Sequence, residues 1–146
     1  MAAQPTNFTR LNVTDADGLS VASVNLPNEI RAHFQAPTAG GALSQTFFIA
    51  DDTYEVIAVR AVWATASTSG TMMLERLQGT EAPDAGDDLL TATVDLASTA
   101  NTVASPALTA TTANLQLAAG DRLGLVLGGT LTNLIGLCVD VILKRI

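Results

Sequence analysis

Four carboxylates gather in one short segment of the chain, at Glu81, Asp84, Asp87 and Asp88. Oxygen-rich loops of this kind can bind calcium, a hard cation that prefers carboxylate and carbonyl ligands. The spacing does not match the D-x-D-x-D-G pattern of a calcium loop. We therefore interpret residues 81–88 as a solvated acidic loop and keep calcium binding as the alternative.

A second acidic group consists of Asp51, Asp52 and Glu55. Two carboxylates held close together can divide the work of a general acid and a general base. Asp51 and Asp52 stand between two expected strands, however, and short polar residues favour turns there. We expect exposed turn residues at this position rather than a catalytic pair.

The chain has one histidine, His33, and one cysteine, Cys138. These are too few for a disulfide or for a Cys/His metal site within one chain. Because no histidine stands near Cys138 in the sequence to activate it, we expect a buried structural thiol. We predict no catalytic residue, no cofactor and no metal site, and hence no enzyme.

Composition limits the partners of the chain. Its 146 residues are 48% hydrophobic and only 14% charged, and the net charge is −7. No basic patch is expected to neutralise phosphates, so we predict no nucleic-acid partner. The most apolar stretches, 123–131 and 134–143, are shorter than the roughly 18 residues that span a bilayer, so no membrane partner is expected. The low charge indicates that part of the apolar surface meets another protein.

The chain divides at residues 36–42, where a proline and two glycines suggest a linker. We expect an extended N-terminal arm and linker over residues 1–43 and one β-sandwich domain over residues 44–146. The arm could form one or two short strands, or a helical turn over residues 27–33. Four of its apolar side chains are our candidates for contact with a capsid: Phe8, Leu11, Val13 and Phe34.

Short segments of alternating hydrophobicity fill the rest of the chain. Strands are predicted over residues 46–49, 54–64, 71–77, 89–96, 108–117, 123–127 and 135–143, with a long loop at 78–88. The final strand has five apolar residues at every second position, namely Ile135, Leu137, Val139, Val141 and Leu143. Many short strands and no long helical pattern predict an all-β, antiparallel β-sandwich of the jelly-roll type.

The strand predicted over residues 54–64 is apolar on both faces. Strict alternation places Trp63 on the core-facing side together with Ile57, Val59 and Ala61. A second apolar face can be buried in a symmetric oligomer, although small residues are also tolerated on an exposed sheet. We favour the oligomer and predict that three residues of the second face lie at a trimer interface: Val56, Ala58 and Val62.

Four stretches of the chain resemble small proteins from the structural gene clusters of tailed bacteriophages: residues 74–90 (LERLQGTEAPDAGDDLL), 98–103 (STANTV), 117–123 (LAAGDRL) and 141–146 (VILKRI). The resemblance covers roughly residues 46–146, and the proteins concerned are head decoration, or cement, proteins. These are jelly-roll trimers on the outside of the capsid.

The resemblance implies a structural virion protein on the capsid exterior, assembled in the host cytoplasm. Its partners would be two further copies of itself, as a homotrimer, and the phage major capsid protein. By bridging neighbouring capsid subunits the trimer would stabilise the shell.

The alternative function is that of a phage fibre or spike component, which would bind a host receptor or glycan through loops such as 78–88. Aromatic rings that combine an apolar body with a polar tip are well suited to stacking on sugars. The chain has only one tryptophan and one tyrosine, which favours the decoration role.

Overall fold

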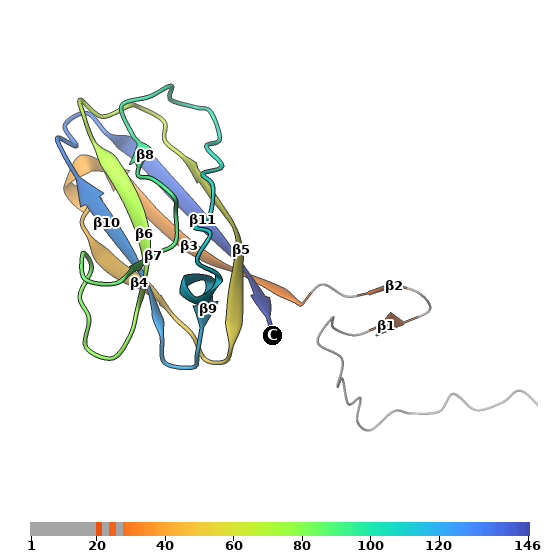
Figure 1. The fold of residues 1–146 in the computed structure, drawn as a ribbon. Coiled ribbons are helices and arrows are strands. Elements are labelled where there is room, and N and C mark those ends of the chain that lie inside the picture. Colours follow the sequence, from red (N-terminus) through yellow and green to blue (C-terminus); the bar gives the residue numbers. More distant parts are fainter. Residues whose placement is uncertain (1–19, 22–23, 26–27) are drawn as a thin grey trace, which may run out of the picture.

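The computed structural model describes residues 20–21, 24–25 and 28–146. Two antiparallel sheets pack face to face, which confirms the predicted all-β sandwich (Figure 1). The elements in chain order are β1 (Ser20–Val21), β2 (Val24–Asn25), β3 (Glu29–Thr38), the 3-10 turn η1 (Ala39–Gly41), β4 (Gln45–Ile49), β5 (Tyr54–Val62), β6 (Thr71–Leu77), β7 (Asp87–Asp88), β8 (Val94–Asp95), the 3-10 turn η2 (Thr112–Leu115), β9 (Gln116–Leu117), β10 (Arg122–Gly128) and β11 (Ile135–Arg145).

The strand order is that of a jelly roll. One sheet has the order β3-β11-β5-β9, and the other has β4-β10-β6-β7 with β8 also paired to β6. After β1 and β2, which pair with each other, the partners are nested: β3 with β11, β4 with β10, β5 with β9, and β6 with β7 and β8. This nesting rolls an eight-stranded ribbon into two sheets, with β7 and β8 together taking the fifth place.

Strand β11 carries the largest part of the core. Its inward residues Leu137, Val139, Val141 and Leu143 are fully buried, as their period-two spacing predicted. Ile135, the first residue of the predicted apolar row, is half-exposed because it lies at the start of the strand. The only tryptophan, Trp63, is also buried, and its indole N–H donates to the carbonyl of Ser98 at 3.4 Å. The single tryptophan therefore reports on this core.

A β-bulge changes which residues of β5 face the core. The register with β11 shifts between Ile142 and Leu143, so that Ala58 is opposite Ile142 while Val56 is opposite Leu143. Such a bulge places two residues against one and reverses the alternation beyond it. Val56 is consequently 1% exposed in the core, whereas Ile57 is 37% exposed. The prediction that Val56 faces a second copy is wrong, while Ala58 and Val62 do lie on the outer face.

The predicted boundary of the arm at residue 43 lies too late in the chain. Strand β3 pairs with β11 along its whole length, from Glu29 with Lys144 to Thr38 with Ile135. Phe34 is only 6% exposed and packs edge-on against Phe47 at 5.9 Å between ring centroids, so it is a core residue and not a contact of the arm. The glycines of the supposed linker form the corner η1 between the two sheets. Phe8, Leu11 and Val13 lie outside the described residues.

The strands predicted over residues 89–96 and 108–117 are mostly irregular. Only Val94–Asp95 and Gln116–Leu117 are strand, and a 3-10 turn precedes the latter. The segments are nevertheless anchored in the core by Leu89, Leu96 and Leu117, which are buried. Apolar residues predicted their burial, but burial of side chains does not require continuous pairing of the backbone.

The bulge can be tested with two neighbouring alanine substitutions. We expect Val56→Ala to lower the free energy of unfolding by about 2 kcal/mol, because it removes buried methyl groups and leaves a cavity. Ile57→Ala should change it by less than about 1 kcal/mol, because that side chain lies outside the core and its removal encloses no cavity. Urea unfolding followed by Trp63 fluorescence measures both free energies. A larger loss of stability for Ile57→Ala than for Val56→Ala would contradict the bulge and favour strict alternation along β5.

Candidate functional site

The outer face of the four-stranded sheet holds two of the three residues predicted to meet another copy. Ala58 and Val62 are half-buried there, on either side of the exposed Arg60. The strand register builds three cross-strand rows on this face, which are Gln35–Cys138–Val62, His33–Asp140–Arg60 and Arg31–Ile142–Ala58. A charged row thus separates two rows that contain the apolar residues, so the face is amphipathic rather than uniformly apolar.

One carboxylate organises the charges on this face. The Nδ1 atom of His33 lies 2.7 Å from a carboxylate oxygen of Asp140, and a guanidinium nitrogen of Arg31 lies 3.9 Å from the other oxygen. Arg60 stands across the strand from Asp140 and adds a second guanidinium to the row. Because two arginines face a single carboxylate, this part of an acidic chain is locally cationic.

A shallow depression of about 230 Å³ opens beside the charged row. Arg60, Val62, Cys138 and Asp140 line it together with Ala61 and the exposed Val103. Val103 is held there because its neighbour Ala104 exchanges backbone hydrogen bonds with Ala61 at 2.8 and 2.9 Å. The depression is large enough for one side chain of a partner, and its lining combines a guanidinium and a carboxylate with small apolar groups.

Cys138 is half-buried on the outer face and lines the depression, so the prediction of a buried thiol is wrong. Burial, and then the charge of Asp140, raise the pKa of the thiol above its ordinary value. Its Sγ atom lies 4.0 Å from Nδ1 of His33, the same nitrogen that contacts Asp140. A nucleophile and an orienting carboxylate need different ring nitrogens to act in relay. These three residues therefore do not form a catalytic triad.

The long loop over residues 78–88 contains the acidic segment 81–88, and the whole of it is called the acidic loop below. It folds back over the outer face of the other sheet. It covers Leu77, which is fully buried although it lies outside the main core, and Glu75, which is 5% exposed. One carboxylate oxygen of Glu75 accepts the backbone N–H groups of Asp84 at 2.9 Å and Gly86 at 3.3 Å. Glu75 thus anchors the loop from below, with Asp84 held at a positive φ of 79°.

Two arginines hold the flanks of the acidic loop. Arg76 forms an ion pair with Asp87 and donates to the carbonyls of Ala113 and Gln116 at 2.6 and 2.9 Å. Arg122 donates to the carbonyls of Gly79 and Glu81 at 2.9 and 3.0 Å. Arg76 and Arg122 thus tie the loop to neighbouring parts of the sandwich.

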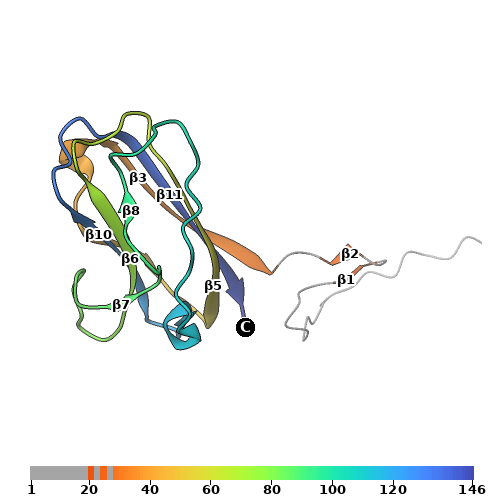
Figure 2. The same ribbon diagram turned by 45° about the horizontal axis from the view of Figure 1, so that its top comes forward.

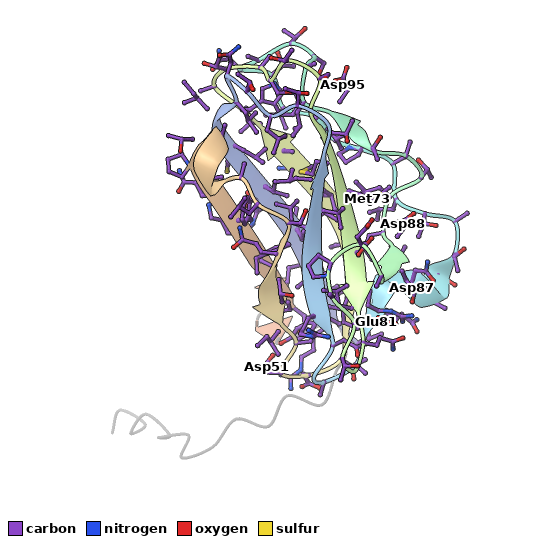
Figure 3. The ribbon with its side chains drawn as sticks, turned by 90° about the vertical axis from the view of Figure 1, so that its left-hand side faces the viewer. Asp51, Met73, Glu81, Asp87, Asp88 and Asp95 are labelled. Carbon is purple, nitrogen blue, oxygen red and sulfur yellow. The ribbon has the colours of Figure 1, made fainter. Side chains whose placement is uncertain are left out.

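The acidic side chains are spread out in space. Glu81, Asp87 and Asp88 lie along the loop, whereas Asp51 and Asp95 lie near opposite ends of the sandwich (Figure 3). Within the part of the chain that the structure describes, no group of three His, Cys, Asp or Glu side chains is placed to hold a metal ion. The acidic loop is therefore a surface feature built around Glu75, Arg76 and Arg122.

The second acidic group stabilises the β4–β5 turn. The hydroxyl of Tyr54 donates to Asp51 at 2.6 Å, which lowers the pKa of the Asp51 carboxyl and, with burial, raises the pKa of the Tyr54 phenol. Asp52 forms an ion pair with Arg145 and accepts the N–H of Thr53 at 2.8 Å. Each carboxylate has its own partner, so the two do not act as an acid and base pair.

Sequence reasoning missed the anchoring role of Glu75 and the gathering of Arg31, His33 and Arg60 around Asp140. The first had a signal, because Glu75 interrupts an otherwise apolar strand just before the acidic loop. The second had none, because these residues come from three strands whose register the sequence does not specify.

Removing the Glu75 carboxylate should loosen the acidic loop. We expect Glu75→Ala to destabilise the closed loop by about 1–3 kcal/mol, because the N–H groups of Asp84 and Gly86 lose a charged acceptor. Glu75→Gln keeps an acceptor oxygen and should stay closer to the native protein. The measurement is the rate of cleavage by a protease specific for acidic residues, with and without calcium. A rate that depends on calcium would support a cation site instead.

The Cys138 thiol should react slowly at neutral pH because its pKa is raised. We expect Asp140→Asn to lower this pKa and to increase the alkylation rate by iodoacetamide at pH 8, since a larger fraction of the thiol is ionised. Glu81→Gln removes a distant charge and serves as the control. Equal rates in native protein and Asp140→Asn would contradict the influence of Asp140.

Comparisons with known proteins identify no relative of this chain. No protein-family model, no curated protein and no solved structure matches the chain. No helix among residues 28–146 and the two short strands before them is long and apolar enough to cross a membrane.

Proposed function

We propose that this chain is a structural virion protein that decorates the outside of a tailed-phage capsid. As a homotrimer it would bridge neighbouring major capsid subunits and stabilise the shell, without catalysis and without nucleic-acid or membrane partners. The proposal starts from the resemblance of residues 74–90, 98–103, 117–123 and 141–146 to decoration proteins. The jelly roll of the chain agrees with the trimeric jelly rolls of that family.

The observation that carries the proposal is the outer face of the four-stranded sheet. Ala58 and Val62 are small enough for close approach of a second copy, and Ile57, which the bulge turns outward, adds apolar surface beside them. The row of His33, Asp140 and Arg60 between them supplies polar groups that can fix the orientation of the copies. An interface with an apolar centre and oriented charges gains affinity from the first and specificity from the second.

The charge distribution supports a molecule with two different sides. Strands β3, β5, β9 and β11 together carry four cationic and three acidic residues, not counting His33. Residues 71–95 on the other sheet carry six acidic residues and one arginine. In a trimer joined through the first sheet, the acidic loops would face outward, where they keep neighbouring particles apart by repulsion.

The alternative role in glycan binding receives less support. Trp63 is 1% exposed and Tyr54 is 5% exposed, and they are the only tryptophan and tyrosine of the chain. Neither ring is available to stack on a sugar. The acidic loop presents carboxylates and backbone groups, and its described residues include no aromatic side chain.

The proposal predicts that a charge at Ala58 prevents trimer formation. Light scattering on a sizing column should give the native chain a mass of about three times 15.0 kDa and give Ala58→Asp a mass near 15.0 kDa. Ile49→Asp places the same charge on an exposed residue of the other sheet and should leave the trimer intact. Urea unfolding followed by Trp63 fluorescence checks that both variants are folded.

The same variants test the decoration role on capsid shells that lack a decoration protein. Native protein and Ile49→Asp should occupy the shells, and Ala58→Asp should occupy them less because a monomer loses multivalent binding. No binding of the native trimer to tailed-phage shells would contradict decoration. Full occupancy by monomeric Ala58→Asp would contradict the role of the trimer.

A further inference from the structure

Strand β3 has an open edge that can accept another strand. It is ten residues long and pairs only with β11, whereas β5 is flanked by β9 and Ala104 and β6 is flanked by β7 and β8. Of the other edge strands, β7, β8 and β9 have two residues each, and β4 is half as long as β3, with its pairing to β10 interrupted by a register shift. In Figure 3, β3 forms the free left-hand border of the sandwich. A long, regular edge of this kind favours strand addition.

The hydrogen bonds to β11 show which backbone groups of β3 point outward. The N–H of Arg145 donates to the carbonyl of Asn28 at 3.0 Å, and the register from there to Thr38 is uninterrupted. Hydrogen-bonded and non-bonded pairs alternate along an antiparallel pair. The residues that direct N–H and C=O toward the open edge are therefore Glu29, Arg31, His33 and Gln35, followed by Pro37, which has no N–H.

The position of Pro37 supports this assignment. Proline is tolerated in an edge strand where its missing N–H would face away from the sheet. It also ends the usable edge, which leaves seven residues from Glu29 to Gln35. Among the described residues, no backbone hydrogen bond from another segment reaches Arg31, His33 or Gln35 on this side.

A side chain on the inner face of β3 also lacks cover. Ile30 lies on the same inward face of β3 as the buried Ala32 and Phe34, yet it is 37% exposed. An added strand would place its own inward side chains beside Ile30 and remove apolar surface from water. The occupant should therefore have apolar residues at alternate positions.

The chain itself contains such a segment upstream of β1. Residues 8–14 are seven residues long, like the open edge. From residue 10 onward, apolar Leu11 and Val13 alternate with polar Arg10, Asn12 and Thr14, whereas Phe8 falls on the polar face. The pair β1–β2 lies beyond the start of β3 and clear of both sheets in two views (Figures 1 and 2). The pair β1–β2 therefore does not cover the edge of β3.

We propose that residues 8–14 of one copy add as a strand to the open edge of β3 in a second copy. The backbone groups of Arg31, His33 and Gln35 bind the incoming strand, and Leu11 and Val13 cover Ile30. This exchange between copies does not depend on the virion role. It links neighbouring copies through backbone pairing, in addition to any contact between sheet faces.

Amide hydrogen exchange of the full-length chain tests the proposal residue by residue. In the native protein at high concentration, the amides of Arg31, His33 and Gln35 should be protected like those of Ala32 and Phe34, which bond to β11. In the double variant Leu11→Asp/Val13→Asp, the three outward amides should exchange at least about tenfold faster, while Ala32 and Phe34 stay protected and report an intact sheet. Asn12→Asp adds a charge on the opposite face of the segment and should retain more protection than the double variant.

A mixing experiment identifies the source of the added strand. Isotope-labelled Leu11→Asp/Val13→Asp chains keep an intact edge, and unlabelled His33→Pro chains keep an intact segment 8–14 but have a blocked edge. Mixing them should restore protection of Arg31, His33 and Gln35 in the labelled chain.

Three results would overturn the proposal. Fast exchange of the outward amides in the native protein would exclude strand addition. Protection that is unchanged in Leu11→Asp/Val13→Asp would exclude residues 8–14 as the occupant. If mixing the two variants does not restore protection of the outward amides in the labelled chain, the added strand belongs to the same chain and not to a second copy. A trimer that binds shells yet shows any of these results would leave the proposed decoration role standing.

Discussion

The pairing of β11 on both sides is the constraint on which the rest of the structure depends. One face of this strand supplies the buried row from Leu137 to Leu143, and the other supplies Asp140 to the charged row. Because side chains alternate, a shift of one residue would place the charge in the core and the leucines in water. The register that stabilises the sandwich is therefore the same register that assembles its outer face, and neither can change alone.

The sequence predicted the fold where alternation was regular and failed where the backbone departed from it. The final strand was correct because its apolar residues recur without interruption. Val56 was misplaced because the bulge of β5 is a property of its pairing with β11, which no local pattern reveals. Strand β3 was taken for an arm because the proline and glycines of residues 36–42 were interpreted as a linker, whereas they form the end of β3 and the corner η1. The contribution of Phe34 becomes visible only when β11 and Phe47 are beside it.

The candidate site was less predictable than the fold, and for a different reason. His33 and Cys138 were singled out as isolated residues more than a hundred positions apart, and their proximity at 4.0 Å follows only from the register of two strands. Their chemistry could still be judged from the sequence, because one histidine and one cysteine offer few combinations. The acidic loop shows the converse: its carboxylates were evident, but the buried Glu75 that shapes it belongs to the preceding strand.

The anchoring of the acidic loop leaves its tip replaceable. Every contact from Glu75 and Arg122 to the loop ends on a backbone N–H or carbonyl, at Asp84 and Gly86 on one side and at Gly79 and Glu81 on the other. The side chains of Ala82 and Pro83 between these anchors take no part. A foreign peptide spliced between Glu81 and Ala82 would interrupt neither the turn closed by Glu81 and Gln78 nor the turn closed by Ala85 and Ala82, which makes this junction a natural site for displaying an antigen or an affinity tag.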